Sequence, residues 1–131
     1  MGNYANALTY YQKALPIFEN VLDTDHPYKA TTYNNIASVY WAQGDYVKAL
    51  EWYQKALRIR ERIFGKDHPD TATVYHNIGT NYFQQGNFRK ASQWLEKALA
   101  IRLRVLGEKH PWTKLTQQYM DAAQRALSGE T

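Results

Sequence analysis

Apolar residues recur at intervals of three and four along two adjacent stretches in the second half of the chain. The first stretch lies between Pro69 and Gln85, and its apolar face holds Ala72, Tyr75, Ile78, Gly79 and Tyr82. The second begins at Phe88 and runs to Leu106, and its apolar face holds Ala91, Leu95, Ala98 and Leu99. Because an α-helix completes a turn every 3.6 residues, each stretch is predicted to be a helix with one apolar face.

Short breaks separate these helices from each other and from the next one. Gly86 interrupts the first pattern, and Asn87 can cap the second helix by accepting a hydrogen bond from its first turn. Gly107 ends the second helix, and Pro111 suits the first turn of another. The pattern therefore predicts two antiparallel helices, called A and B here, joined by a tight turn.

This helix pair is one copy of a pattern that returns every 42 residues. The copies read GNYANAL from Gly2, GDYVKAL from Gly44 and GNFRKAS from Gly86, and a His-Pro pair returns at His26, His68 and His110. A fixed period of this length is typical of stacked helical units. We expect six helices, in the order B-A-B-A-B-A, at residues 4–23, 28–43, 46–64, 70–85, 88–106 and 112–127. The expected units are 1–27 (a B helix alone), 28–69, 70–111 and 112–131.

Three departures from the repeat predict local differences. Pro16 stands inside the first B helix and should kink it, and Asp23 replaces the glycine that ends the later B helices. The last A helix changes register, and its apolar stripe is expected to contain Trp112, Leu115, Tyr119, Ala122, Ala123 and Ala126. Such a stripe suits a terminal capping helix that has one solvent-exposed face. Elsewhere, small residues mark the places where helices must approach closely, namely Ala49, Ala56, Ala91 and Ala98.

Composition narrows the classes of protein. A chain of 131 residues with 44% hydrophobic content forms one domain or one array with a core. No run of 18 apolar residues and no secretory signal occurs, so we expect a cytoplasmic protein without a membrane contact. The absence of cysteine excludes disulfides and thiolate chemistry. The net charge is +4, and eight Lys/Arg stand against four Asp/Glu from Gly86 onward, which could favour an acidic partner but is too mild to indicate nucleic acid.

The alternation of large and small residues resembles the tetratricopeptide repeat. When each unit is numbered so that Gly44 and Gly86 are position 15, the signature positions hold Tyr33, Ile36, Ala37, Tyr40, Ala49, Tyr53 and Ala56, then Tyr75, Ile78, Gly79, Tyr82, Ala91, Leu95 and Ala98. The longer B helix and the His-Pro junction are similar to the 42-residue variety of kinesin light chains and many bacterial repeat proteins. The resemblance implies an all-α fold, an α-solenoid in which antiparallel helix pairs wind into a right-handed superhelix. It specifies the scaffold more than the function.

The resemblance also implies a binding surface. In the family, the A helices line a concave groove that holds an extended peptide, and an asparagine at position 6 clamps the peptide backbone. That position holds Asn35 and Asn77, whose amides can donate and accept together. In the last copy it holds Tyr119, which is counted among the expected peptide-binding residues but ends the series of asparagines. The neighbouring groove positions are Thr31, Asn34, Ser38 and Trp41, then Thr73, His76, Thr80 and Phe83. Trp41 and Phe83 could instead be buried between units, and His76 could lie at the edge of the core.

Other chemistry is poorly supported. The repeated histidines belong to successive loops roughly 10–20 Å apart, too far to share one ion, so we predict no metal and no cofactor. The arginines near the ends of the B helices are expected on a solvated face or paired with neighbours such as Glu61, with contact to an acidic partner as the alternative; they are Arg58, Arg60, Arg62, Arg102 and Arg104. No nucleophile–base pair, phosphate loop or pair of carboxylates indicates an enzyme. Helical repeats that read RNA have a different period.

The leading hypothesis is a protein-interaction scaffold that binds an extended segment of a partner protein in the groove. The alternative is homo-oligomerisation through the terminal helices. The first helix lacks an A partner and would expose part of a face with Tyr4, Leu8, Tyr11 and Leu15, on which the last helix of another copy could dock. A related possibility is that the chain is a fragment whose missing helices are supplied in the intact protein.

Overall fold

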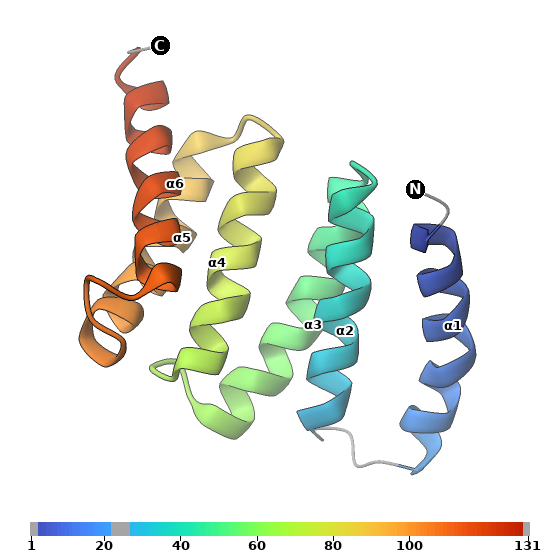
Figure 1. Ribbon diagram of the computed structural model, residues 1–131. Coiled ribbons are helices and arrows are strands. Elements are labelled where there is room, and N and C mark those ends of the chain that lie inside the picture. The colour runs from blue at the N-terminus through green and yellow to red at the C-terminus, as the bar shows by residue number, and fades with distance from the viewer. Residues whose placement is uncertain (1–2, 22–26, 130–131) are drawn as a thin grey trace. The chain divides into compact units, whose positions relative to one another are not determined.

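The structure is a computed structural model that describes residues 3–21 and 27–129, and within the first helix it describes side chains other than those at 3, 14 and 17–21. Within these residues the chain forms six helices and no strand (Figure 1). They are α1 (Asn3–Val21), α2 (Pro27–Ala42), α3 (Tyr46–Phe64), α4 (Pro69–Gln84), α5 (Phe88–Val105) and α6 (Pro111–Leu127). The predicted all-α fold and its six helices are confirmed, and each predicted end within the described residues lies within one residue of the observed one. The predicted end of the first helix, at residue 23, lies outside the described residues.

The turns form as the sequence predicts in the described part of the chain. Gly86 has a φ of +81° and Gly107 a φ of +88°, a left-handed conformation that residues with a side chain rarely adopt. The side chain of Asn87 then caps α5, because its Oδ1 accepts a hydrogen bond of 3.3 Å from the backbone N–H of Lys90. The predictions on Gly2, Asp23, His26 and the side chain of Asn3 fall outside the described residues.

The chain divides into two compact units, Met1–Ile63 and Phe64–Thr131, which are described separately. In the first unit Ala49 and Ala56 of α3 are fully buried, as predicted for positions of close helix approach. Tyr53 of the same helix is also buried, and its hydroxyl lies 3.1 Å from the hydroxyl of Ser38 on α2. Burial raises the pKa of Tyr53, and the hydrogen bond with Ser38 opposes that rise.

In the second unit α4 and α5 pack with almost no space between their backbones. A Cβ atom placed on Gly79 would lie 2.7 Å from the Cγ atom of Leu95, closer than two carbon atoms can approach. Leu95, Ala91 and Ala98 are fully buried on the facing side of α5. Figure 1 shows that α6 runs in the same direction as α4, with α5 packed against both.

The buried face of α6 differs from the predicted one. Thr113, Thr116, Met120 and Ala123 form that face, so only Ala123 was predicted correctly. Trp112 and Leu115 are instead 55% and 43% exposed. The reason is the polar environment that α5 offers, since Thr116 accepts a hydrogen bond from the Arg102 side chain and Thr113 donates one to the Arg102 backbone carbonyl. Hydrogen-bonding threonines therefore take core positions that a purely apolar pattern assigns to Trp112 and Leu115.

Candidate functional site

In the first unit the predicted groove residues lie on α2 with different degrees of exposure. Thr31 and Asn35 are exposed, and Asn34 is half-buried. Ser38 is half-buried and held by its hydrogen bond with Tyr53. Trp41 is half-buried too, and its indole nitrogen is shielded from solvent. Asn35 is therefore the predicted backbone clamp whose amide is at the surface of this unit.

In the second unit the corresponding residues of α4 are more enclosed. Asn77 is half-buried, and its backbone carbonyl oxygen accepts a hydrogen bond of 3.0 Å from the hydroxyl of Thr80, a buried residue. Thr73 is half-buried, and its hydroxyl donates to the carbonyl oxygen of Pro69 at 3.2 Å. These bonds hold the α4 residues of the predicted groove in fixed positions.

His76 belongs to the core of the second unit. It is 6% exposed, its Nδ1 lies 3.0 Å from the hydroxyl oxygen of Thr116, and its ring meets the edge of Tyr119 at 5.7 Å between centroids. Burial lowers the pKa of His76 to about 3, with a further contribution from the positive charge of Arg102. His76 is therefore neutral near pH 7 and acts as a packed hydrogen-bonding residue.

Arg102 is another residue whose position differs from the one predicted from the sequence. It is 4% exposed instead of solvated, and burial lowers the pKa of its guanidinium. Its Nη1 donates to the Thr116 hydroxyl at 2.9 Å and to the Trp112 carbonyl oxygen at 3.2 Å, and its Nη2 donates to the Thr73 hydroxyl at 3.4 Å. Its guanidinium carbon also lies 5.7 Å from the Trp112 ring centre. All of these contacts are with uncharged groups.

A helical-wheel argument could have found this burial. Arg102 stands four residues after Ala98 and seven after Leu95, so it continues the face by which α5 enters the core. The neighbouring Arg104 points elsewhere, and its guanidinium pairs with the carboxylate of Asp67 at 2.7 Å. Both side chains of that pair are more than half exposed, so the pair contributes little to stability.

A hollow of about 260 Å³ lies between the end of α4 and α6 in the second unit. Its lining residues are Phe83, Leu115, Gln118, Tyr119 and Ala122. The ring of Phe83 meets the edges of Tyr119 at 5.4 Å and of Phe88 at 5.2 Å, so Phe83 both packs against the core and lines the hollow. Gln118 was not singled out from the sequence, and Leu115 and Ala122 were predicted as part of the apolar stripe of the last helix and not as residues of the binding surface. Counting positions 2, 5 and 9 through the last copy of the repeat would have identified them.

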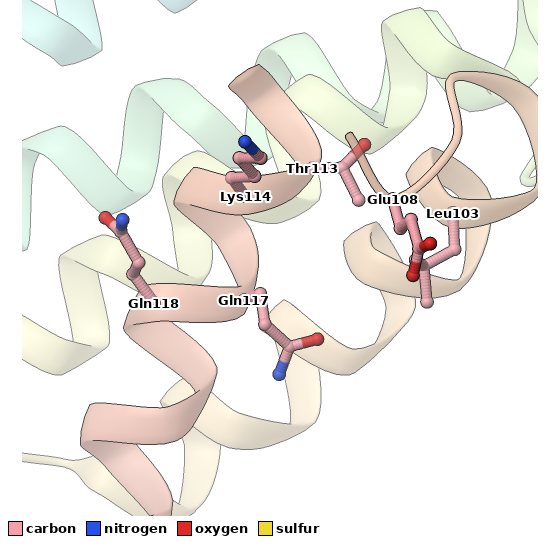
Figure 2. A pocket seen from close by; sticks show the side chains of 6 residues that line it. All are labelled: Leu103, Glu108, Thr113, Lys114, Gln117 and Gln118. Atoms are coloured by element: carbon pink, nitrogen blue, oxygen red, sulfur yellow. The ribbon is translucent and has the colours of Figure 1, made fainter. Parts of the chain in front are cut away.

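A second hollow, of about 350 Å³, lies where the end of α5 meets α6 (Figure 2). Its lining residues are Leu103, Glu108, Thr113, Lys114, Gln117 and Gln118. Figure 2 shows Gln117 extending from α6 toward Glu108 and Leu103, whereas Gln118 projects from a different side of the helix. The walls of this hollow contain both polar and apolar side chains. Gln117 also donates a hydrogen bond of 2.8 Å to the carboxylate of Asp121.

The repeated His-Pro pair has a structural role at the start of two A helices. The Nδ1 of His68 accepts a hydrogen bond of 3.0 Å from the backbone N–H of Asp70, and that of His110 accepts one of 3.1 Å from Trp112. Each imidazole therefore acts as the N-cap of its helix, and the following proline occupies the first turn. Across residues 3–21 and 27–129, no group of three or more His, Asp or Glu could hold a metal ion.

No helix within the described part of the chain is long and apolar enough to cross a membrane.

Comparisons with known proteins agree with this architecture. A family model described as the tetratricopeptide repeat matches residues 1–61 and 28–104. The crystal structure of BtubC (BKLC) from P. vanneervenii is similar, with a TM-score of 0.88 and 27% identity over 98% of this chain and 51% of that one. A crystal structure described as kinesin light chain TPR-like repeats of Podosopora anserina is also similar. Its TM-score is 0.87 and its identity is 23%, over 98% of this chain and 61% of that one. No curated protein sequence matches the chain.

The chain therefore spans between half and two thirds of the length of these solved structures. The 23% identity with the Podosopora anserina repeats supports the fold alone.

Proposed function

Because the chain belongs to the tetratricopeptide repeat family, whose members generally serve as protein-interaction scaffolds, we propose that it binds an extended segment of a partner protein along its A helices. Asn35 and Asn77 hold the main chain of that segment in this proposal. Each amide can donate to a peptide carbonyl and accept from a peptide N–H at the same time.

The observation that carries the proposal is a recurring set of polar groove positions. Positions 2, 6 and 9 hold Thr31, Asn35 and Ser38 on α2, and Thr73, Asn77 and Thr80 on α4. The hydroxyls of Ser38, Thr73 and Thr80 are occupied by hydrogen bonds within their own unit. The asparagine at position 6 recurs on both helices, and its amide has both a donor and an acceptor to offer to a bound main chain.

The competing hypothesis of head-to-tail assembly receives less support. The helix pair α4–α5 packs through Tyr75 and Gly79 of α4, and the equivalent positions of α6 hold the polar residues Gln117 and Asp121. A B-type helix of a second copy would have to bury these two groups, which costs free energy unless each finds a new partner.

The test is a random peptide library screened against the full chain, followed by affinity measurements on the selected peptides. The double variant Asn35→Ala, Asn77→Ala should weaken binding by about 1–3 kcal/mol, or roughly 5- to 150-fold. The matched control is the double variant Gln54→Ala, Gln93→Ala, which removes two exposed amides from the B helices. Circular dichroism checks that both variants keep their helices. Equal affinity of the asparagine variant and the native chain would refute the assignment of the clamp.

A further inference from the structure

The groove positions of α6 break the polar pattern of the other A helices. Positions 2, 6 and 9 of this helix hold Leu115, Tyr119 and Ala122, where α2 and α4 carry threonine, asparagine and serine or threonine. Trp112 and Ala126 extend the same row by one turn at each end. We call these five residues the α6 stripe: Trp112, Leu115, Tyr119, Ala122 and Ala126. Their spacing of three and four places them on one face of the helix.

The core of the second unit leaves the α6 stripe accessible. The core uses a neighbouring face, formed by Thr113, Thr116, Met120 and Ala123. Trp112 is 55% exposed and Leu115 43% exposed, and the other three members of the stripe are half-buried. Three of the five residues line the hollow of about 260 Å³ beside Phe83. A continuous apolar row of this kind at a hollowed surface is typical of a site that another chain covers.

The charge beside the stripe identifies the chemistry of that chain. Lys114, Gln118 and Arg125 follow one another at helical spacing along one edge of the stripe, and all three are exposed. Within residues 27–129, neither Lys114 nor Arg125 forms an ion pair. The nearest acidic residue on α6, Asp121, already accepts a hydrogen bond from Gln117. An apolar row edged by two unpaired cations suits an apolar surface edged by carboxylates.

The spacing of the stripe favours a helix over an extended segment. Its members rise along α6 by about 5.3 Å on average, and it is about 21 Å long. Apolar residues on one face of a partner helix repeat at the same average rise, so the two rows stay in register. Side chains on one face of an extended strand repeat every 6.6 Å or so, which loses register by about 4 Å within three steps. The small side chains of Ala122 and Ala126 also permit close approach of a second helix.

We propose that the α6 stripe docks an amphipathic helix of a partner protein, with acidic residues on the flank that faces Lys114 and Arg125. The proposal rests on the role of the chain as a protein-interaction scaffold, and it is independent of the asparagine clamp. A second copy of the chain fits less well. In an antiparallel pair of α6 helices related by a twofold axis, Lys114 of one copy would face Arg125 of the other, and like charges repel.

The proposal is tested with three synthetic peptides and the full chain, by isothermal titration calorimetry and circular dichroism. The first peptide is an amphipathic helix of about 18 residues with a leucine face and a glutamate flank. The second has lysine in place of each glutamate, and the third is the acidic peptide with two central prolines that prevent a helix. The acidic helix should bind at least about tenfold more tightly than either of the others and gain helicity on binding.

Matched variants locate the site. Leu115→Ala should weaken binding of the acidic helix by about tenfold, whereas Leu103→Ala, which removes an equally exposed leucine from α5, should have no effect. The double variant Lys114→Glu, Arg125→Glu should reverse the preference, so that the lysine peptide binds better. Gln93→Ala, which removes an exposed amide from α5, should leave binding unchanged. The asparagine clamp is tested separately, with the peptides selected from the random library.

Several results would overturn the proposal. They are equal losses in Leu115→Ala and Leu103→Ala, equal affinity for the acidic and basic peptides, equal affinity for the proline peptide, and no binding of the acidic helix. Light scattering of the chain without peptide tests whether a second copy of the chain occupies the stripe. A doubled mass that returns to the monomer value in Leu115→Ala would assign the stripe to self-association instead.

Discussion

Arg102 Nη1 donates a hydrogen bond of 2.9 Å to the hydroxyl of Thr116, and this bond joins α5 to α6 inside the core of the second unit. The same hydroxyl lies 3.0 Å from Nδ1 of His76 on α4. One threonine therefore connects three helices. A buried guanidinium is costly unless its N–H groups find acceptors, and here neutral oxygens provide them.

Replacing Thr116 by valine should destabilise the protein by about 1–3 kcal/mol, because the change keeps the shape and removes one of the acceptors of Arg102 and the partner of His76. Urea unfolding of the full chain measures the loss. Thr116→Ser should recover most of the stability, and Thr31→Val, on the exposed surface of α2, serves as the control. In the double variant Arg102→Met, Thr116→Val, the loss should be smaller than the sum of the single losses, since the buried charge is gone. Strict additivity would argue against the network.

The stability of the protein should fall as the pH drops from about 6.5 toward 3. His76 has a pKa of about 3 in the folded chain and one near 6.5 when solvated, so below pH 6.5 the unfolded state binds a proton that the folded state does not. The contribution of neutral His76 is fully present above pH 6.5 and is lost progressively below it. In His76→Gln this part of the dependence should vanish, which reduces the slope by up to about 1.4 kcal/mol per pH unit. Unfolding curves of both proteins between pH 7 and pH 4.5 test this difference, and superimposable pH profiles would contradict it.

The imidazole caps of α4 and α6 should each contribute measurable stability. His68→Ala and His110→Ala remove the acceptor for the backbone N–H groups of Asp70 and Trp112, and each should cost about 0.5–2 kcal/mol. Asparagine at either position also accepts this hydrogen bond and should retain most of the stability. The denaturation midpoint of each variant in urea measures the effect. If alanine and asparagine variants unfold at the same concentration, the capping role is wrong.

Much of the fold could be predicted because its signals are local. The spacing of Ala72, Tyr75, Ile78 and Gly79 defines a helix within one short segment, and the turn residues Gly86 and Asn87 act on their own backbone. The period of 42 residues then extends one helix pair to the whole chain. The positions of close helix contact were equally predictable, because a small side chain such as that of Ala91 or Ala98 allows two helices to approach closely. Both alanines are fully buried in the structure.

The candidate site was predictable only in part. Positions counted from Gly44 and Gly86 lead to the polar groove residues of α2 and α4, but they do not reveal that His76 and Thr80 are buried. Whether a polar residue at such a position is exposed depends on the helix packed beside it, here α6, which brings Thr116 and Tyr119 against His76. The ligand of these positions stays a prediction.

The sequence alone determined the six helices, the turns between helices within residues 27–129 and the family, because periodicity, glycine and capping chemistry act over a few neighbouring residues. The tertiary structure decided how α6 is rotated, and with it the exposure of Trp112 and Leu115. The apolar residues of α6 could have faced the core or the solvent with equal helical regularity. On the face that packs against α5, the Thr116 hydroxyl accepts a hydrogen bond from the buried guanidinium of Arg102, and the Thr113 hydroxyl donates one to the backbone carbonyl of Arg102, so this face satisfies polar groups that the apolar stripe could not.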